Sequence, residues 1–158
     1  MSPVIRANVW LSGLILLLAG AAWWCQQDRN LPPDTITNLA PAQITRIRIL
    51  REGQLLQRLE KQGQVWKRLP SGAPVKDREW LDKVLHIAEL PSLHHFPVDE
   101  SRLSDFGLEP PRYTLVVNDQ PLELGMLDPA SGLRYLRVGP TLHLITDSYT
   151  HLLYRKKP

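Results

Sequence analysis

The chain has 158 residues, which is enough for one domain, or for one domain with a targeting segment. All 16 acidic residues and all but one of the 19 basic residues lie at or beyond Asp28, so this part carries 18 bases against 16 acids, a charge of only +2. A nearly neutral domain without a clustered basic face argues against nucleic-acid binding. The single cysteine excludes an intramolecular disulfide framework and a cysteine-based zinc site.

The first element in chain order is an uncharged run, Val9–Cys25. A helix of that length is roughly 26 Å long, at the short end of what crosses a bilayer. Trp10 lies at one end, and Trp23 and Trp24 lie at the other, where indole rings favour the membrane interface. We therefore expect residues 1–27 to form a single N-terminal transmembrane signal-anchor that leaves the C-terminal part in the periplasm.

The alternative is a cleaved signal peptide, because Ala19-Gly20-Ala21 has the small-x-small form that signal peptidase prefers. Cleavage there would leave the tryptophan pair near the start of the mature chain. A lipoprotein anchored through Cys25 is excluded, since two tryptophans precede that cysteine where small residues are required. An unpaired Cys25 permits a crosslinked dimer without requiring one.

Residues 28–41 are rich in proline and lack a sustained apolar period, which predicts a linker. Residues 42–158 are then expected to form one periplasmic domain. Its first part is a meander of three antiparallel strands, because short alternating segments are separated by turns at Gly53 and Gly63. The three predicted strands are Ile44–Leu50, Gln54–Glu60 and Gln64–Leu69.

One main helix follows, with Asp77 as its N-cap and Pro91 beyond its end. A strand is expected at Ser92–Phe96, and a single helical turn at Ser101–Phe106, closed by Gly107 in a left-handed conformation. The last third returns to strands and ends in a helical segment at Ser148–Tyr154. The strands of this part are Tyr113–Val117, Leu122–Leu127, Leu133–Val138 and Thr141–Thr146.

The pattern as a whole predicts an α+β fold of mostly antiparallel β meanders, with about seven strands and one main helix, preceded by the single transmembrane helix. The glycines and prolines of the last third have local roles. Gly107 suits a positive φ, and Pro110 and Pro111 favour an extended entry into the next strand. Gly125 within a strand indicates a β-bulge or a close backbone approach.

The order of these segments resembles the domain-of-unknown-function family 4340. The resemblance covers roughly residues 44 to 145 and is carried by "DFGLEPPRYTLVV" at Asp105–Val117, "LELGML" at Leu122–Leu127 and "LRYLRVG" at Leu133–Gly139. It implies a membrane-anchored bacterial envelope protein of unknown function, in some cases beside ABC-type transport machinery, and it brings no catalytic residues. The motif positions are Gly107, Leu108, Pro110, Pro111, Gly125 and Tyr135.

Histidines and acids are the candidates for chemistry. His94 and His95 are adjacent, so on a strand they point to opposite faces and do not converge on one metal ion. Asp99, Glu100 and Asp105 form an acidic cluster, for which capping of the short helical turn is the simpler explanation. The serines lack a nucleophile elbow, and no phosphate-binding loop is present. We therefore predict no catalytic, cofactor or metal site.

Two basic features remain, the arginines of the first strand, Arg46 and Arg48, and the Arg155–Lys157 end of the chain. Charges on the solvent face of an edge strand protect it from pairing with other chains. The same charges suit an acidic partner or anionic lipid headgroups.

These observations predict a non-enzymatic, single-pass protein of the bacterial inner membrane. Its periplasmic domain would be an accessory or interaction module of an envelope complex, with a membrane-protein partner and without a cofactor. The alternative is an envelope hydrolase, or a glycan- or lipid-binding module, that uses the acidic and histidine residues between positions 94 and 105.

Overall fold

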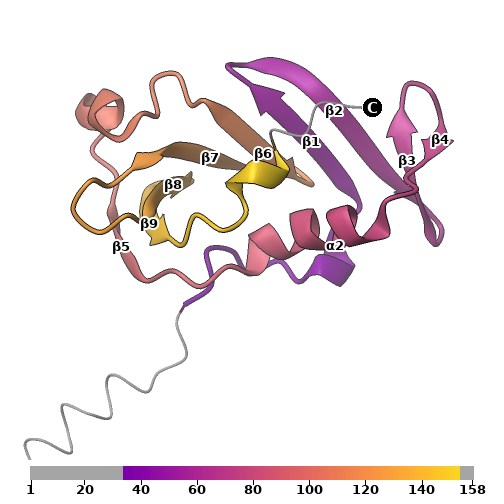
Figure 1. Cartoon of the computed structure of the whole chain (residues 1–158), viewed down its shortest axis with the longest axis horizontal. Coiled ribbons are helices and arrows are strands. Elements are labelled where there is room, and N and C mark those ends of the chain that lie inside the picture. The colour runs from indigo at the N-terminus through magenta and orange to yellow at the C-terminus, as the bar shows by residue number, and fades with distance from the viewer. Residues whose placement is uncertain (1–33, 154–158) are drawn as a thin grey trace, which may run out of the picture. The chain divides into compact units, whose positions relative to one another are not determined.

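The computed structural model describes residues 34–153, and the predicted membrane anchor lies outside them. The described chain forms one antiparallel sheet with the strand order β4-β3-β2-β1-β6-β7-β8-β9-β5 (Figure 1). No helix within residues 34–153 is long and apolar enough to cross a membrane. The strands are β1 Arg46–Arg51, β2 Gln54–Gln62, β3 Val65–Leu69, β4 Ala73–Pro74, β5 His94–Pro97, β6 Tyr113–Val117, β7 Gln120–Leu127, β8 Arg134–Val138 and β9 Thr141–Ile145.

The predicted α+β class is confirmed, and the predicted strands agree with the observed ones to within two residues at each end. The sheet has nine strands rather than about seven, in part because the two-residue strand β4 pairs with β3. Of the segment predicted to be helical at the end of the chain, the described residues 148–153 contain only the 3₁₀ turn η5, Thr150–Leu152.

One main helix covers one face of this sheet, which we call the inner face (Figure 1). Helix α2 spans Arg78–His86 and continues into the 3₁₀ turn η3, Ile87–Glu89. The predicted N-cap is confirmed, because the Asp77 carboxylate accepts a hydrogen bond from the Trp80 backbone N–H at 2.9 Å. The Trp80 indole N–H donates to the Leu152 carbonyl at 3.1 Å, which ties η5 to the helix.

The inner face follows from the period of two in the strands. Ile47 and Ile49 of β1 are buried, and Ile47 lies between Leu59 of β2 and Val117 of β6. Leu115 faces the same side beside Ile49. These side chains and the apolar stripe of α2 form one hydrophobic core.

Strand β1 is not an edge strand, so the interpretation of Arg46 and Arg48 as edge protection is wrong. β1 pairs with β2 on one side and with β6 on the other. The β1–β6 pairing joins the two meanders across more than sixty residues of sequence. The local pattern carries no signal for such a distant partner.

The last part of the predicted linker, residues 34–41, lies against the domain. Ile36 and Thr37 are buried. The Ile36 N–H donates to the Leu90 carbonyl at 3.0 Å, and the Ser92 N–H donates to the Asp34 carbonyl at 2.7 Å. This short antiparallel bridge fixes the chain beside the end of the main helix.

On the opposite, outer face of the sheet, the described residues provide cover over β7, β8 and β9. The cover is the 3₁₀ turn η4, Glu100–Phe106, which ends at Gly107 with φ +68°, as predicted. The Phe106 ring lies 4.9 Å from the Tyr135 ring, measured between centroids. A Cβ on Gly125 would lie 2.2 Å from the Phe106 carbonyl oxygen and 3.3 Å from Leu108 Cγ.

The predicted close backbone approach at Gly125 is therefore confirmed, and the register shift between Leu124 and Leu127 shows the predicted irregularity as well. Pro111 forms an isolated bridge with Leu108, and the Glu109–Pro110 peptide is cis. Gly107, Leu108 and Gly125 thus serve the packing of η4 on the sheet. The extended conformation predicted at Pro110 is wrong, because Pro110 lies in the turn between the bridged residues.

We expect Gly125→Ala to lower the free energy of unfolding by about 3 kcal/mol, because the added methyl group must displace the η4 backbone. Urea denaturation of the domain would measure this loss. Gly132→Ala is the control, since its Cβ meets nothing within 4 Å and only the positive φ disfavours it, by about 1 kcal/mol. Equal losses in the two variants would contradict the packing explanation.

Candidate functional site

Within residues 34–153, the part of the outer face over β1, β2, β3 and β6 has no such cover, and we call it the open face. Its members follow from the strand register, since residues opposite Arg48 and its alternate neighbours share its side of the sheet. They include both charged and apolar side chains. The open face consists of Arg46, Arg48, Leu50, Leu55, Arg58, Glu60, Lys67, Leu69, Thr114 and Val116, of which Val116 is buried.

Arg48 and Arg58 form the centre of the open face. They are directly opposite each other in the β1–β2 ladder, and both are exposed. Within residues 34–153, neither side chain forms a hydrogen bond or an ion pair. Like charges at directly opposed positions destabilise an antiparallel pair, so this arrangement does not serve the stability of the isolated domain.

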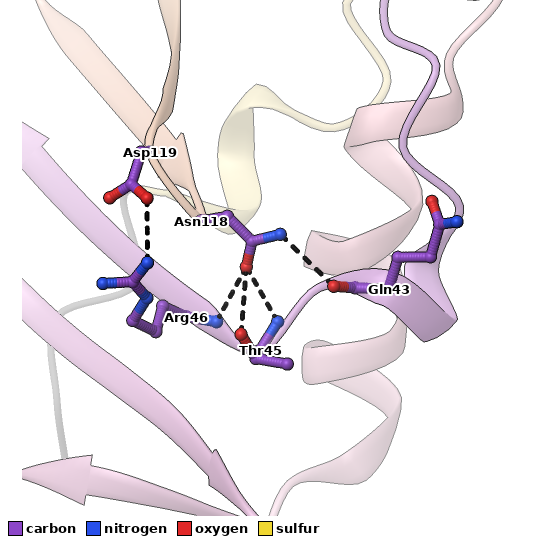
Figure 2. A network of polar contacts seen from close by, with 5 residues as sticks. All are labelled: Gln43, Thr45, Arg46, Asn118 and Asp119. Atoms are coloured by element: carbon purple, nitrogen blue, oxygen red, sulfur yellow. Dashed lines mark hydrogen bonds and ion pairs between the residues drawn. The ribbon is translucent and has the colours of Figure 1, made fainter.

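Arg46 differs from Arg48, although the sequence singles out both. The Arg46 guanidinium forms an ion pair with the Asp119 carboxylate at 2.8 Å (Figure 2). Asp119 lies in the turn between β6 and β7, so Arg46 joins the first strand to this turn. Arg51, at the end of β1, lies 4.0 Å from the Glu52 carboxylate. Among the arginines of β1 and β2, the two without an ion pair or hydrogen bond inside the described range are therefore Arg48 and Arg58. Sequence reasoning missed Arg58 because the β1–β2 register is not visible in the sequence.

Asn118 organises the same end of the open face (Figure 2). Its side-chain oxygen accepts hydrogen bonds from the Thr45 N–H at 2.9 Å, the Thr45 hydroxyl at 3.2 Å and the Arg46 N–H at 3.3 Å. Its amide group donates to the Gln43 carbonyl at 3.2 Å. Asn118 has φ 53°, a conformation that asparagine tolerates better than most residues. This side chain therefore fixes the start of β1 on the β6–β7 turn.

The histidines do not assemble a metal site. His94 and His95 are exposed on β5, at the edge of the sheet, and His143 is buried on β9. The rings of His95 and His143 lie 6.0 Å apart. Within the described chain, no three histidine, cysteine or acidic side chains are grouped so that they could hold a metal ion.

A buried serine–histidine contact accompanies this pair. His143 Nδ1 lies 2.9 Å from the Ser92 hydroxyl oxygen, and the Ser92 hydroxyl donates to the His94 carbonyl at 3.1 Å. With its proton committed to that carbonyl, the Ser92 oxygen is left to accept from the imidazole, which does not activate it as a nucleophile. Burial, and to a lesser extent His95, lower the pKa of His143.

The three acids of the predicted cluster have separate structural partners. Asp99 caps η4 by accepting a hydrogen bond from the Ser101 N–H at 3.0 Å, as predicted. The hydrogen bond from the Ser101 hydroxyl, and to a lesser extent that from the Ser101 N–H, lowers the pKa of Asp99. Glu100 forms an ion pair with Arg137 at 2.7 Å. Asp105 forms an ion pair with Arg102 at 2.9 Å.

A further polar cluster, not predicted from the sequence, fixes the end of the sheet. Arg134 forms two hydrogen bonds to the Asp147 carboxylate and one to the Gly125 carbonyl. The Thr150 hydroxyl also donates to Asp147. Burial alone would raise the pKa of Asp147, but the hydrogen bonds from Arg134 and Thr150 and the guanidinium charge lower it overall. This cluster therefore stabilises the turn that leads to η5.

Comparison of the chain with protein-family models, with curated proteins and with solved structures finds no match. The resemblance to the domain-of-unknown-function family 4340 thus stays a prediction from the motif residues.

We expect Asn118→Gly to lower the free energy of unfolding by about 2 kcal/mol, because glycine keeps the positive φ but removes four hydrogen bonds at the start of β1. Asn118→Asp keeps the accepting oxygen and should cost about half as much. Urea denaturation of both variants would test the ranking. If Asn118→Gly is as stable as the wild type, the network does not fix β1.

The lowered pKa of His143 predicts a loss of stability in mild acid. The unfolded chain binds the proton more readily than the folded one, so stability is fully present well above pH 6.5 and falls as the pH drops through about 6.5. His143→Asn removes this titration while keeping a donor toward Ser92. Unfolding measured from pH 8 to about pH 5 should show a flatter slope for this variant. His94→Asn, an exposed change on β5, should keep the wild-type slope.

Proposed function

We propose that this protein is a non-enzymatic, single-pass protein of the bacterial inner membrane, and that its periplasmic domain is an interaction module of an envelope or transporter-type complex. The observation that carries this proposal is the open face. It presents two exposed, directly opposed arginines without partners in the described chain, on strands that are otherwise fully integrated in the sheet. A surface that lowers stability in isolation is understandable if it serves a partner.

Two features of the sequence support the membrane part of the proposal. The uncharged run Val9–Cys25 carries Trp10 at one end and Trp23 with Trp24 at the other. The resemblance to family 4340 adds the association of some members with ABC-type transport machinery, which makes a membrane protein the preferred partner.

The contacts of the polar residues favour binding over catalysis. The acids between positions 99 and 105 each take a separate structural partner, and the Ser92 proton is committed to a backbone carbonyl. A hydrolase would need such groups to converge on one substrate position.

Gentle-detergent purification of the full-length protein from native membranes, followed by mass spectrometry, would test the proposal. We expect a stoichiometric membrane-protein partner. A matched control replaces residues 1–27 with an unrelated single-span anchor and should retain that partner, since the domain is proposed to bind it. Recovery of the protein alone at normal yield, or its appearance in the soluble fraction, would overturn the proposal.

A further inference from the structure

Resting on the proposed function, we propose that Arg48 and Arg58 form an anion-recognition pair that docks an acidic segment of a partner protein onto the open face. The two residues lie on adjacent strands in direct register. Both are exposed and neither is engaged within the described chain. Two guanidinium groups at one place on a sheet can bind a carboxylate through charge-assisted, bidentate hydrogen bonds.

The surroundings of the pair suit a protein interface. Leu69, which is half-buried, lies opposite Arg58 on β3, whereas Val116, opposite Arg48 on β6, is buried. Leu50 follows on the same face of β1. An arginine pair flanked by aliphatic side chains combines the charged and apolar contacts from which protein interfaces gain most of their binding energy.

The charge pattern favours a protein over a lipid surface. Beside the Arg48–Arg58 pair, the next cross-strand line of the open face consists of Arg46, Glu60 and Lys67, with Glu60 in the middle. The Asp119 carboxylate lies next to Arg46. An anionic membrane would repel these carboxylates wherever it met the arginines. A protein segment can place its acidic side chains against Arg48 and Arg58 alone. A partner that complements both the arginines and the nearby carboxylates therefore needs charges at defined positions, which a protein has and a lipid surface lacks.

The direct opposition of Arg48 and Arg58 gives a clear test, because one substitution should weaken binding of the partner without lowering the stability of the fold. Arg58→Glu places opposite charges across the β1–β2 ladder, so the melting temperature should stay equal or rise. The same change removes half of the anion site and opposes an acidic segment. We therefore expect recovery of the partner with the full-length variant to fall about tenfold or more.

Arg78→Glu is the matched control. It makes the same charge change at an exposed position of α2, which covers the inner face of the sheet, and should leave recovery of the partner unchanged. A loss of partner with Arg58→Glu together with a lower melting temperature would mark a folding defect and overturn the assignment. So would unchanged recovery with Arg58→Glu.

Photo-crosslinking in cells would identify the molecule that binds the open face. A photoreactive amino acid is placed in the full-length chain at Leu50 or Thr114, a cross-strand pair beside Arg48, and at Asp82 on the exposed side of α2. We expect adducts from the first two positions to map to a partner peptide that contains Asp or Glu. Reversal of that acid to Arg should restore binding to Arg58→Glu. Adducts to phospholipid, or to a peptide without acids, would overturn the proposal.

Failure of this inference is distinguishable from failure of the proposed function. A stable partner that crosslinks only from Asp82 and tolerates Arg58→Glu leaves the interaction module in place and overturns the arginine pair. The absence of any adduct together with purification of the protein alone overturns both.

Discussion

In the part of the chain that the structure describes, a nine-stranded sheet has two faces, and one main helix is the only substantial element that covers them. Helix α2 buries the inner face, and the hydrophobic core lies between them. A sheet exposes its second face unless something else packs on it. Here the short turn η4 covers β7 to β9, so the described elements leave the open face over β1, β2, β3 and β6 without cover. The arrangement of the candidate site depends on this division.

The two halves of the outer face therefore have different chemistry. Under η4, the Phe106 backbone lies so close to Gly125 that a side chain at this position would not fit, and the Phe106 ring packs on Tyr135. Over β1 and β2 the sheet instead presents Arg48 and Arg58. One half is closed by the close approach at Gly125 and by aromatic rings, and the other has no such packing among residues 34–153.

The polar clusters fix this framework from its ends. Asn118 holds the start of β1 on the β6–β7 turn, and Arg134 with Asp147 holds the last turn on the bulged strand. The first cluster also engages Arg46 through Asp119. It therefore engages Arg46 and leaves Arg48 without an ion pair inside the described range, which is the condition for the proposed partner contact.

The sequence by itself determined the local elements. Period-two alternation, the Asp77 cap, the left-handed Gly107 and the close approach at Gly125 could all be predicted, because each depends on neighbouring residues or on one backbone position. The tertiary structure alone decided that β1 is central and that Arg58 opposes Arg48. Those facts depend on strand register and on pairing between distant segments, for which short-range side-chain patterns carry no information.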